Sequence, residues 1–368
     1  MPQTEDTTVG KLPYYDVGSL LKVYYNFISL LRKSKPMLSD STETFLVGSG
    51  KYTGSNTSVF VTEGVHRLLY FSYRNCFSQL PNGSTTDSGW GCLLRTGQMV
   101  LGQVLMRFNA HCSSFIPSAE VEKVRQQTQP LFMDTPTAPF SIHQLELEAR
   151  KIGVACGMWL SPTQVCRAMH ATLLKYYEES GRGPYPVCCI DRDIVTQTIL
   201  PILERPEPVV LLIPVALGID KIGDRYEEAL LHCLKMKSLC GIAGGYRHAS
   251  YYLCGCQQRE VLYLNPHYIQ EAYVSEKTAG NLVGNWNTIS VEKLDPCMLF
   301  GFYIANKEEF IDFLEDLKVM NSFLVFPLIT VSNVDSEDNR TSEKDAQRVD
   351  AANGDESCNE FETRNLAS

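Results

Sequence analysis

The segment Asp87-Ser-Gly-Trp-Gly-Cys-Leu-Leu-Arg95 joins a polar loop to a long apolar stretch, and the fold prediction starts from it. The loop before it is rich in Pro, Asn, Gly, Ser and Thr, a composition typical of turns. From Cys92 to Phe108 the chain has no proline, and its apolar side chains recur with helical spacing. We therefore predict a buried helix that begins at or near Cys92.

A cysteine at the first turn of a helix is well placed to act as a nucleophile. The thiolate is the reactive form, and a free thiol has a pKa of ~8.5. Unpaired N–H groups and a partial positive charge at a helix N-terminus both favour the thiolate. The flanking Gly89 and Gly91 let a substrate backbone come close, and the Cys92 backbone N–H would point toward a developing oxyanion. A buried core cysteine at a glycine-rich turn would give the same pattern, so the motif alone leaves both interpretations open.

The segment Leu262-Tyr-Leu-Asn-Pro-His267 reads as a strand that runs into a turn. Residues two apart in an extended chain point to the same side, so Asn265 and His267 are expected to be neighbours. Pro266 fixes its own φ and pushes Asn265 into the extended region. A histidine with a hydrogen-bond acceptor beside it has the arrangement of a general base, with the acceptor fixing the ring tautomer. An ordinary Asn-Pro turn is the alternative.

The remaining pattern mixes helices and strands, and we predict an α+β fold. Short β-branched or aromatic runs predict strands at 45–47, 187–190, 209–215, 251–254 and 261–264. Helical patterns occupy 20–31, 162–178, 192–204 and 224–236, and a helical or mixed segment is expected at 66–80. The glycines at 241, 244 and 245 predict a mobile loop before the Tyr251 strand.

Composition and length limit the classes of function. The chain has 368 residues and a formal net charge of -9, which argues against nucleic acid as the main partner. We expect an N-terminal extension over 1–44, a catalytic domain over 45–332 and an acidic disordered tail over 333–368. The thirteen irregularly spaced cysteines and the absence of a signal pattern favour reduced thiols in the cytoplasm. No metal-ligand spacing and no nucleotide-binding motif is present in the sequence, so neither a metal site nor a cofactor is expected.

The fourteen residues Thr86-Asp-Ser-Gly-Trp-Gly-Cys-Leu-Leu-Arg-Thr-Gly-Gln-Met99 closely resemble the nucleophile segment of the autophagins, the autophagy-related cysteine proteases. Further motifs that fit the family in order are spread over roughly residues 45–330. The resemblance implies a papain-like fold with a small family-specific extra subdomain. It also implies a cysteine-type endopeptidase that cleaves an autophagy ubiquitin-like modifier of the GABARAP type after its C-terminal glycine and releases it from phosphatidylethanolamine. Contact with the autophagosomal membrane would then be peripheral, through the lipidated substrate.

The resemblance assigns roles to individual residues. By match of motif, Cys92 is the nucleophile and His267 the base. Tyr73 lies where the family has an oxyanion-side tyrosine, and Trp159 lies where a tryptophan covers the substrate glycine. The stretch from Gly244 to His248 matches a gating loop, so Gly244 and Gly245 are expected to contact substrate.

The sequence departs from the family at the base and in the gating loop. Asn265 stands where an aspartate is usual, Arg247 where a proline is usual, and Tyr251 where a histidine is common. A neutral amide accepts a bond from the imidazole but cannot stabilise its positive charge, so slower turnover is expected. A weakly active or inactive fold that binds the modifier is one alternative, and a papain-like hydrolase for a different ubiquitin-like tail is another. Tyr14-Tyr-Asp-Val17 is either a strand-adding motif for the modifier or the apolar start of the first helix.

Overall fold

The computed structural model describes residues 38–112, 114–205, 207–247, 249–275 and 284–333. The helix predicted at 20–31, the motif from Tyr14 to Val17, most of the N-terminal extension and the tail from 334 onward lie outside the described residues. The predicted domain boundaries therefore remain predictions.

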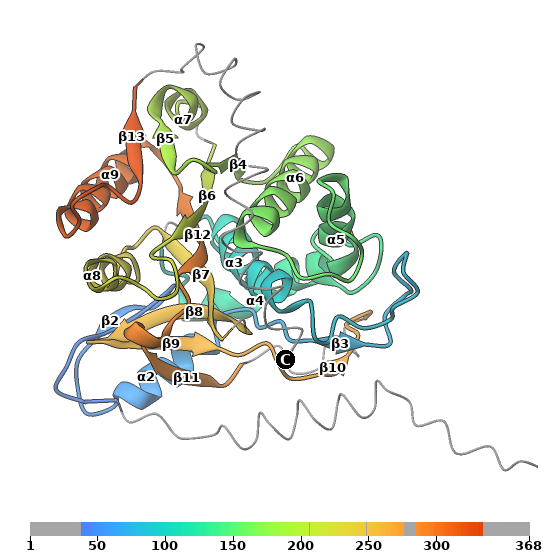
Figure 1. The fold of residues 1–368 in the computed structure, drawn as a ribbon, viewed down its shortest axis with the longest axis horizontal. Coiled ribbons are helices and arrows are strands. Elements are labelled where there is room, and N and C mark those ends of the chain that lie inside the picture. The colour runs from blue at the N-terminus through green and yellow to red at the C-terminus, as the bar shows by residue number, and fades with distance from the viewer. Residues whose placement is uncertain (1–37, 113, 206, 248, 276–283, 334–368) are drawn as a thin grey trace, which may run out of the picture.

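A mixed sheet of nine strands in the described residues forms the centre of the molecule (Figure 1). The strands follow the order β11-β9-β8-β7-β12-β6-β4, and β1 attaches to β8 and carries β2. β4 pairs with β6 in parallel, whereas the other pairings along this path are antiparallel. The strands are β1 (Thr44–Leu46), β2 (Gly50–Tyr52), β4 (Tyr185–Cys188), β6 (Val209–Ala216), β7 (Leu239–Tyr246), β8 (Ala249–Gln257), β9 (Glu260–Leu264), β11 (Trp286–Ser290) and β12 (Cys297–Ile304).

Helices cover both faces of this sheet (Figure 1). Because both faces are covered, the strand β6, next to the edge strand β4, is a continuous apolar run that is buried along almost all its length, without alternation of apolar and polar residues. One face carries α3 (Cys92–Asn109), α4 (Ser118–Thr128), α5 (Ile142–Lys151) and α6 (Pro162–Ser180), and the other carries α8 (Asp224–Cys233) and α9 (Lys307–Ser322). The remaining helices are α2 (Thr57–Val65), α7 (Thr196–Leu203) and two short 3₁₀ helices, η1 (Gln129–Phe132) and η3 (Val291–Lys293).

The helix α3 is buried on nearly all sides. It contacts β7, β8 and β12 of the sheet. Close approach to β12 depends on Gly301, since a Cβ there would overlap Cγ1 of Val100. At the far end of α3, the buried Arg107 donates to the backbone carbonyls of Lys237, Ser238 and Leu239, so its charge is held by hydrogen bonds.

Two small parallel pairings lie outside the main sheet. β3 (Arg74–Asn75) pairs with β10 (Gln270–Glu271), and β5 (Asp193–Val195) pairs with β13 (Thr330–Ser332). The first of these joins two segments that are almost two hundred residues apart in the sequence.

Most predicted elements are confirmed, and three are wrong in part. The chain over 66–80 holds no helix but a coil with the short β3, and residues 192–204 divide into β5 and α7. The glycine-rich segment is not a mobile loop: Gly241, Gly244 and Gly245 belong to β7. Close packing explains why these glycines lie in a strand. A Cβ at Gly241 would overlap the Tyr252 ring of the neighbouring strand.

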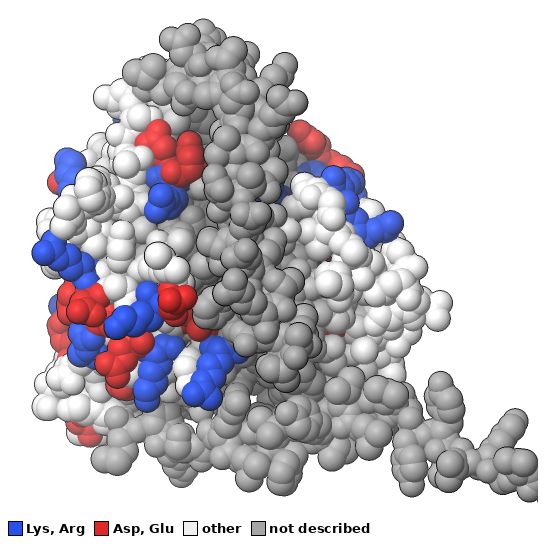
Figure 2. Space-filling model, in the orientation of Figure 1, with Lys and Arg blue, Asp and Glu red and all other residues white. Residues whose placement is uncertain are grey.

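Charged side chains of both signs are intermixed on the face shown in Figure 2, over the region near α8. There Arg259 pairs with Glu227 and Glu228. Glu227 is buried, whereas the pair with the exposed Glu228 contributes little to stability. None of the helices in the described stretches combines the length and apolarity needed to cross a membrane.

Candidate active site

Cys92 is the first residue of α3, at the end of a tight turn. The backbone N–H groups of Trp90 and Gly91 both donate to the Asp87 carbonyl, at 3.3 and 2.9 Å, which reverses the chain just before the helix. Gly91 is the N-cap and lies against the Asp87 side chain, where an added Cβ would be 2.7 Å from Asp87 Cβ. The absence of a side chain at position 91 thus allows the turn to close, and the helix starts at Cys92 as the sequence predicted.

His267 follows the end of β9 and is oriented by Asn265. The Asn265 side-chain oxygen Oδ1 accepts from the His267 backbone N–H at 3.0 Å and lies 2.7 Å from His267 Nδ1. An oxygen at that position requires the proton on Nδ1, which leaves Nε2 as the nitrogen that can accept a proton. The Tyr70 hydroxyl donates to the Asn265 carbonyl at 2.7 Å and so stabilises the turn that carries His267.

Tyr73 connects the cysteine to the histidine. Its ring meets the His267 ring edge-on, with ring centroids 5.2 Å apart, and its side chain hydrogen-bonds the Cys92 sulfur. Tyr73, Cys92 and Ile269 form a small buried cluster of their own. Backbone bonds from Tyr73 N–H to the Pro266 carbonyl and from Gln270 N–H to the Tyr73 carbonyl, both 2.9 Å, fasten Tyr73 to the histidine segment. The structure therefore brings Cys92, Tyr73, Asn265 and His267 into one site.

Tyr251 lies on another side of the histidine ring. Its ring centroid is 5.7 Å from that of His267, with an interplanar angle of 80°, so the imidazole contacts two tyrosine rings edge-on. These contacts restrict rotation of the imidazole and keep it in an apolar setting.

The Cys92 thiol is buried, with 2% of the residue exposed. Burial raises the pKa of this thiol, although the Ser250 backbone, the Tyr73 side chain and the backbone of the first turn of α3 hydrogen-bond the sulfur and act in the opposite direction. The sequence suggested that the helix N-terminus would lower this pKa, and in the closed site burial outweighs that effect. A peptide tail reaches the sulfur only after neighbouring groups move.

Trp159 lies beside the loop that precedes Cys92. Its indole N–H donates to the Gly89 carbonyl, and 38% of the residue is exposed. The tryptophan thus bridges the segment before α6 and the segment before α3. It is an exposed cover over this loop and not part of the core.

Gly244 and Gly245 pair with Tyr251 and Ser250 across the β7–β8 hairpin. The turn itself comes after them and contains Arg247, whose φ of 51° lies in the left-handed region. Ser250 links this hairpin to α3, because its hydroxyl lies 2.8 Å from the Thr96 hydroxyl of that helix and donates to the Gly244 carbonyl at 3.1 Å.

A family model described as the peptidase C54 catalytic domain matches residues 60–316, well over half of the chain. The chain belongs to the peptidase C54 family.

Named relatives agree with this assignment. The chain is 32% identical over 300 residues to "Cysteine protease ATG4b" of Arabidopsis thaliana, a match that covers 72% of this chain and 62% of the relative. It is 31% identical over 258 residues to "Probable cysteine protease atg4" of Schizosaccharomyces pombe, covering 67% and 73%. The match spans less than two thirds of two Arabidopsis relatives, 62% of ATG4b and 65% of ATG4a. The expected enzyme class, a cysteine-type peptidase, and the papain-like α+β fold are those of this family.

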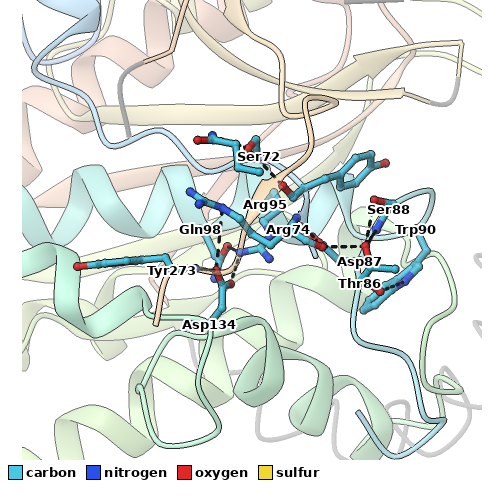
Figure 3. Close-up of polar contacts among 12 residues, drawn as sticks. Ser72, Arg74, Thr86, Asp87, Ser88, Trp90, Arg95, Gln98, Asp134 and Tyr273 are labelled. Carbon is cyan, nitrogen blue, oxygen red and sulfur yellow. Dashed lines mark hydrogen bonds and ion pairs between the residues drawn. The ribbon is translucent and has the colours of Figure 1, made fainter. Parts of the chain in front are cut away.

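Behind the C54 site lies a buried network of four charged side chains that sequence analysis missed (Figure 3). Arg95 Nε donates to Asp87 Oδ2 at 2.6 Å, and its Nη1 donates to Asp134 Oδ1 at 2.7 Å. Arg74 donates its backbone N–H to Asp87 Oδ1 at 2.6 Å and its Nη1 to the Glu271 carbonyl at 2.8 Å. Each of the four side chains is at most 1% exposed.

The network fastens the three segments that carry the candidate site residues. Arg74 follows Tyr73, Arg95 lies one turn after Cys92, and the Asp134 carboxylate accepts from the backbone N–H of Tyr273, in the segment after His267, at 2.8 Å. Burial opposes the charge of Arg95, but the carboxylates of Asp134 and Asp87 outweigh it and raise the Arg95 pKa above its ordinary value. No sequence signal marked Asp134 as a partner of Arg95, because the two are far apart along the chain.

Among the residues that the structure describes, no group of three His, Cys, Asp or Glu side chains is arranged to hold a metal ion.

Proposed function

We propose that this chain is a cysteine endopeptidase that cleaves an autophagy ubiquitin-like modifier after its C-terminal glycine. The observation that carries the proposal is the position of Tyr73, in contact with both the Cys92 sulfur and the ring of His267. The substrate class is the one that the resemblance to the autophagins implies, and the relatives named as ATG4 cysteine proteases support that family. A modifier of the GABARAP type is the proposed partner, and the proposed location is the cytoplasm.

The proposed chemistry assigns one step to each residue. Cys92 Sγ attacks the carbonyl carbon of the terminal glycine, and His267 Nε2 takes the thiol proton and later gives it to the leaving amine. Asn265 keeps the other ring nitrogen protonated, since its Oδ1 lies 2.7 Å from Nδ1. The Cys92 backbone N–H and the Tyr73 hydroxyl stabilise the oxyanion. Water then hydrolyses the thioester and releases the modifier.

The same chemistry extends to the lipidated modifier. Phosphatidylethanolamine is joined to the glycine through an amide, so attack on the glycine carbonyl produces the same thioester with the lipid amine as the leaving group. Contact with the autophagosomal membrane is then peripheral and comes through the substrate.

Substrate access depends on movement, because Cys92 is 2% exposed. Trp159 is proposed to lie over the substrate glycine once its bond to the Gly89 carbonyl is released. Gly244 and Gly245 are proposed to contact the substrate backbone from the end of β7.

The test is to incubate the full chain with a modifier that carries extra residues beyond its terminal glycine. Mass spectrometry is expected to show one cut, directly after the glycine, and no cut with Cys92→Ala or with a modifier whose terminal glycine is replaced by valine. Tight binding without any cut by the unmodified chain would contradict the proposal and favour a binding module. A cut at another position would favour a hydrolase for a different tail.

A further inference from the structure

Three cysteines meet where α6 packs against the edge strand β4, away from the site residues described above. Cys166 lies in the first half of α6, and Cys188 and Cys189 are at the end of β4. Cys166 Sγ is 2.9 Å from Cys188 Sγ and also lies 3.5 Å from the Leu212 carbonyl of β6. All three cysteines are free thiols in this structure.

We propose that Cys166 and Cys188 form a reversible disulfide, a redox modification site that joins α6 to β4. The sulfur atoms need to approach by only about 0.9 Å to reach a disulfide bond length of ~2.05 Å. The helix and the strand that carry them already pack together, and the two sulfur atoms are already in contact. This inference does not depend on the proposed function.

The exposure of the two cysteines indicates which of them the oxidant reaches first. Cys188 is half-buried and open to a small oxidant, whereas Cys166 is fully buried. Burial raises the pKa of Cys189, to about 12, and also that of Cys166, so position decides between them: Cys166 Sγ already lies 2.9 Å from Cys188 Sγ.

The step balances with hydrogen peroxide as the oxidant. The Cys188 sulfur attacks one peroxide oxygen, the O–O bond breaks, and Cys188 sulfenic acid and one water form. The Cys166 sulfur then attacks the sulfenic sulfur and displaces hydroxide, which takes the Cys166 proton and leaves as a second water. Two thiols are oxidised and one peroxide is reduced, and a dithiol reductant reverses the bond.

The disulfide would lie on α6, the helix that packs directly against α3. Val165 and Met169 of α6 lie against Gly97 of α3, where an added Cβ would be 3.2 Å from Val165 Cγ1 and 2.9 Å from Met169 Sδ. α6 also begins at Pro162, three residues beyond Trp159. The disulfide would fix this helix to the sheet and close a loop of more than twenty residues, which stabilises the folded state.

The test is peptide mapping of the full chain after treatment with hydrogen peroxide and blocking of free thiols. Trypsin releases residues 152–167, with Cys156 and Cys166, and 183–192, with Cys188 and Cys189. A linked pair of these peptides, lighter by about 2 Da than their sum, is expected, with fragment ions that assign the bond to Cys166 and Cys188. We also expect a thermal midpoint higher by about 5 °C than that of the reduced protein, and reversal of both changes by a dithiol.

Serine variants of single cysteines test which two residues form the bond. Cys166→Ser and Cys188→Ser each abolish the link and the thermal shift, whereas Cys156→Ser and Cys189→Ser retain both. Because Cys188 is half-buried, its serine variant keeps the test valid if the Cys166 variant fails to fold. The proposal is overturned if the link runs through Cys156 or Cys189, or if no link forms under conditions that oxidise the exposed Cys76.

Discussion

Arg95 Nε donates to Asp87 Oδ2 at 2.6 Å, and both side chains are almost completely buried. Asp87 accepts the two N–H groups that start the turn before Cys92, and Arg95 lies on the first turn of the helix that follows. This ion pair therefore fixes the position of Cys92, the proposed nucleophile, in the same way that Asn265 fixes the His267 ring.

Loss of the Asp87 charge should destabilise the fold. Asp87→Asn leaves the buried Arg95 with one carboxylate fewer, and breaking a buried pair costs about 3–5 kcal/mol. The free energy of unfolding, measured by denaturant titration, is expected to fall by about that amount. Glu315→Gln, which removes one partner of the exposed pair with Lys318, is the matched control and should change it by less than ~0.5 kcal/mol. Equal effects of the two substitutions would show that the buried ion pair contributes no more to the free energy of unfolding than an exposed one.

Restoring an aspartate beside His267 should speed catalysis. In Asn265→Asp, a carboxylate takes the place of Oδ1, 2.7 Å from Nδ1, and stabilises the imidazolium by charge. We expect kcat/KM for modifier cleavage to rise by about 5- to 10-fold, the effect of ~1–1.4 kcal/mol. A fall or no change would mean that Asn265 does not limit the base.

Removing the Tyr73 hydroxyl should make Cys92 harder to ionise. The Tyr73 hydrogen bond lowers the pKa of the Cys92 thiol, against burial, which raises it. In Tyr73→Phe the pKa therefore rises further, and the pH profile of Cys92 alkylation by iodoacetamide should move to higher pH. The profile of the exposed Cys76 in the same samples is the internal control. An unchanged profile, or one moved to lower pH, would exclude this hydrogen bond from the solution structure.

Removing the Trp159 cover should open the site. Trp159→Ala loses both the ring and the bond to the Gly89 carbonyl, so Cys92 alkylation should become several-fold faster at a fixed pH. Trp159→Phe keeps an aromatic ring without the N–H donor and should give an intermediate rate. If both variants react as slowly as the unmodified chain, another group closes the site.

The sequence predicted the parts of the site that depend on local physics. A proline-free apolar stretch predicted α3 with its first residue, and Pro266 predicted that Asn265 and His267 would be neighbours, which the 2.7 Å contact confirms. The raised pKa of Cys92 was not predictable, because it depends on burial by segments far along the chain.

Other features depended on close tertiary contact. The glycines of β7 predict a loop, since glycine disfavours strands. In the structure, Gly245 instead permits approach of the Ala249 carbonyl, and Gly241 permits that of the Tyr252 ring. The Arg95–Asp134 pair joins residues 39 apart in the sequence, and no periodicity signals such a contact.

The most direct test of the central claim is covalent capture with a modifier whose terminal glycine carries a thiol-reactive electrophile. The account predicts a single adduct on Cys92, located by peptide mapping, that is absent in Cys92→Ala and forms far more slowly in His267→Ala. An adduct on a different cysteine, or an unchanged rate of capture without the His267 imidazole, would contradict it.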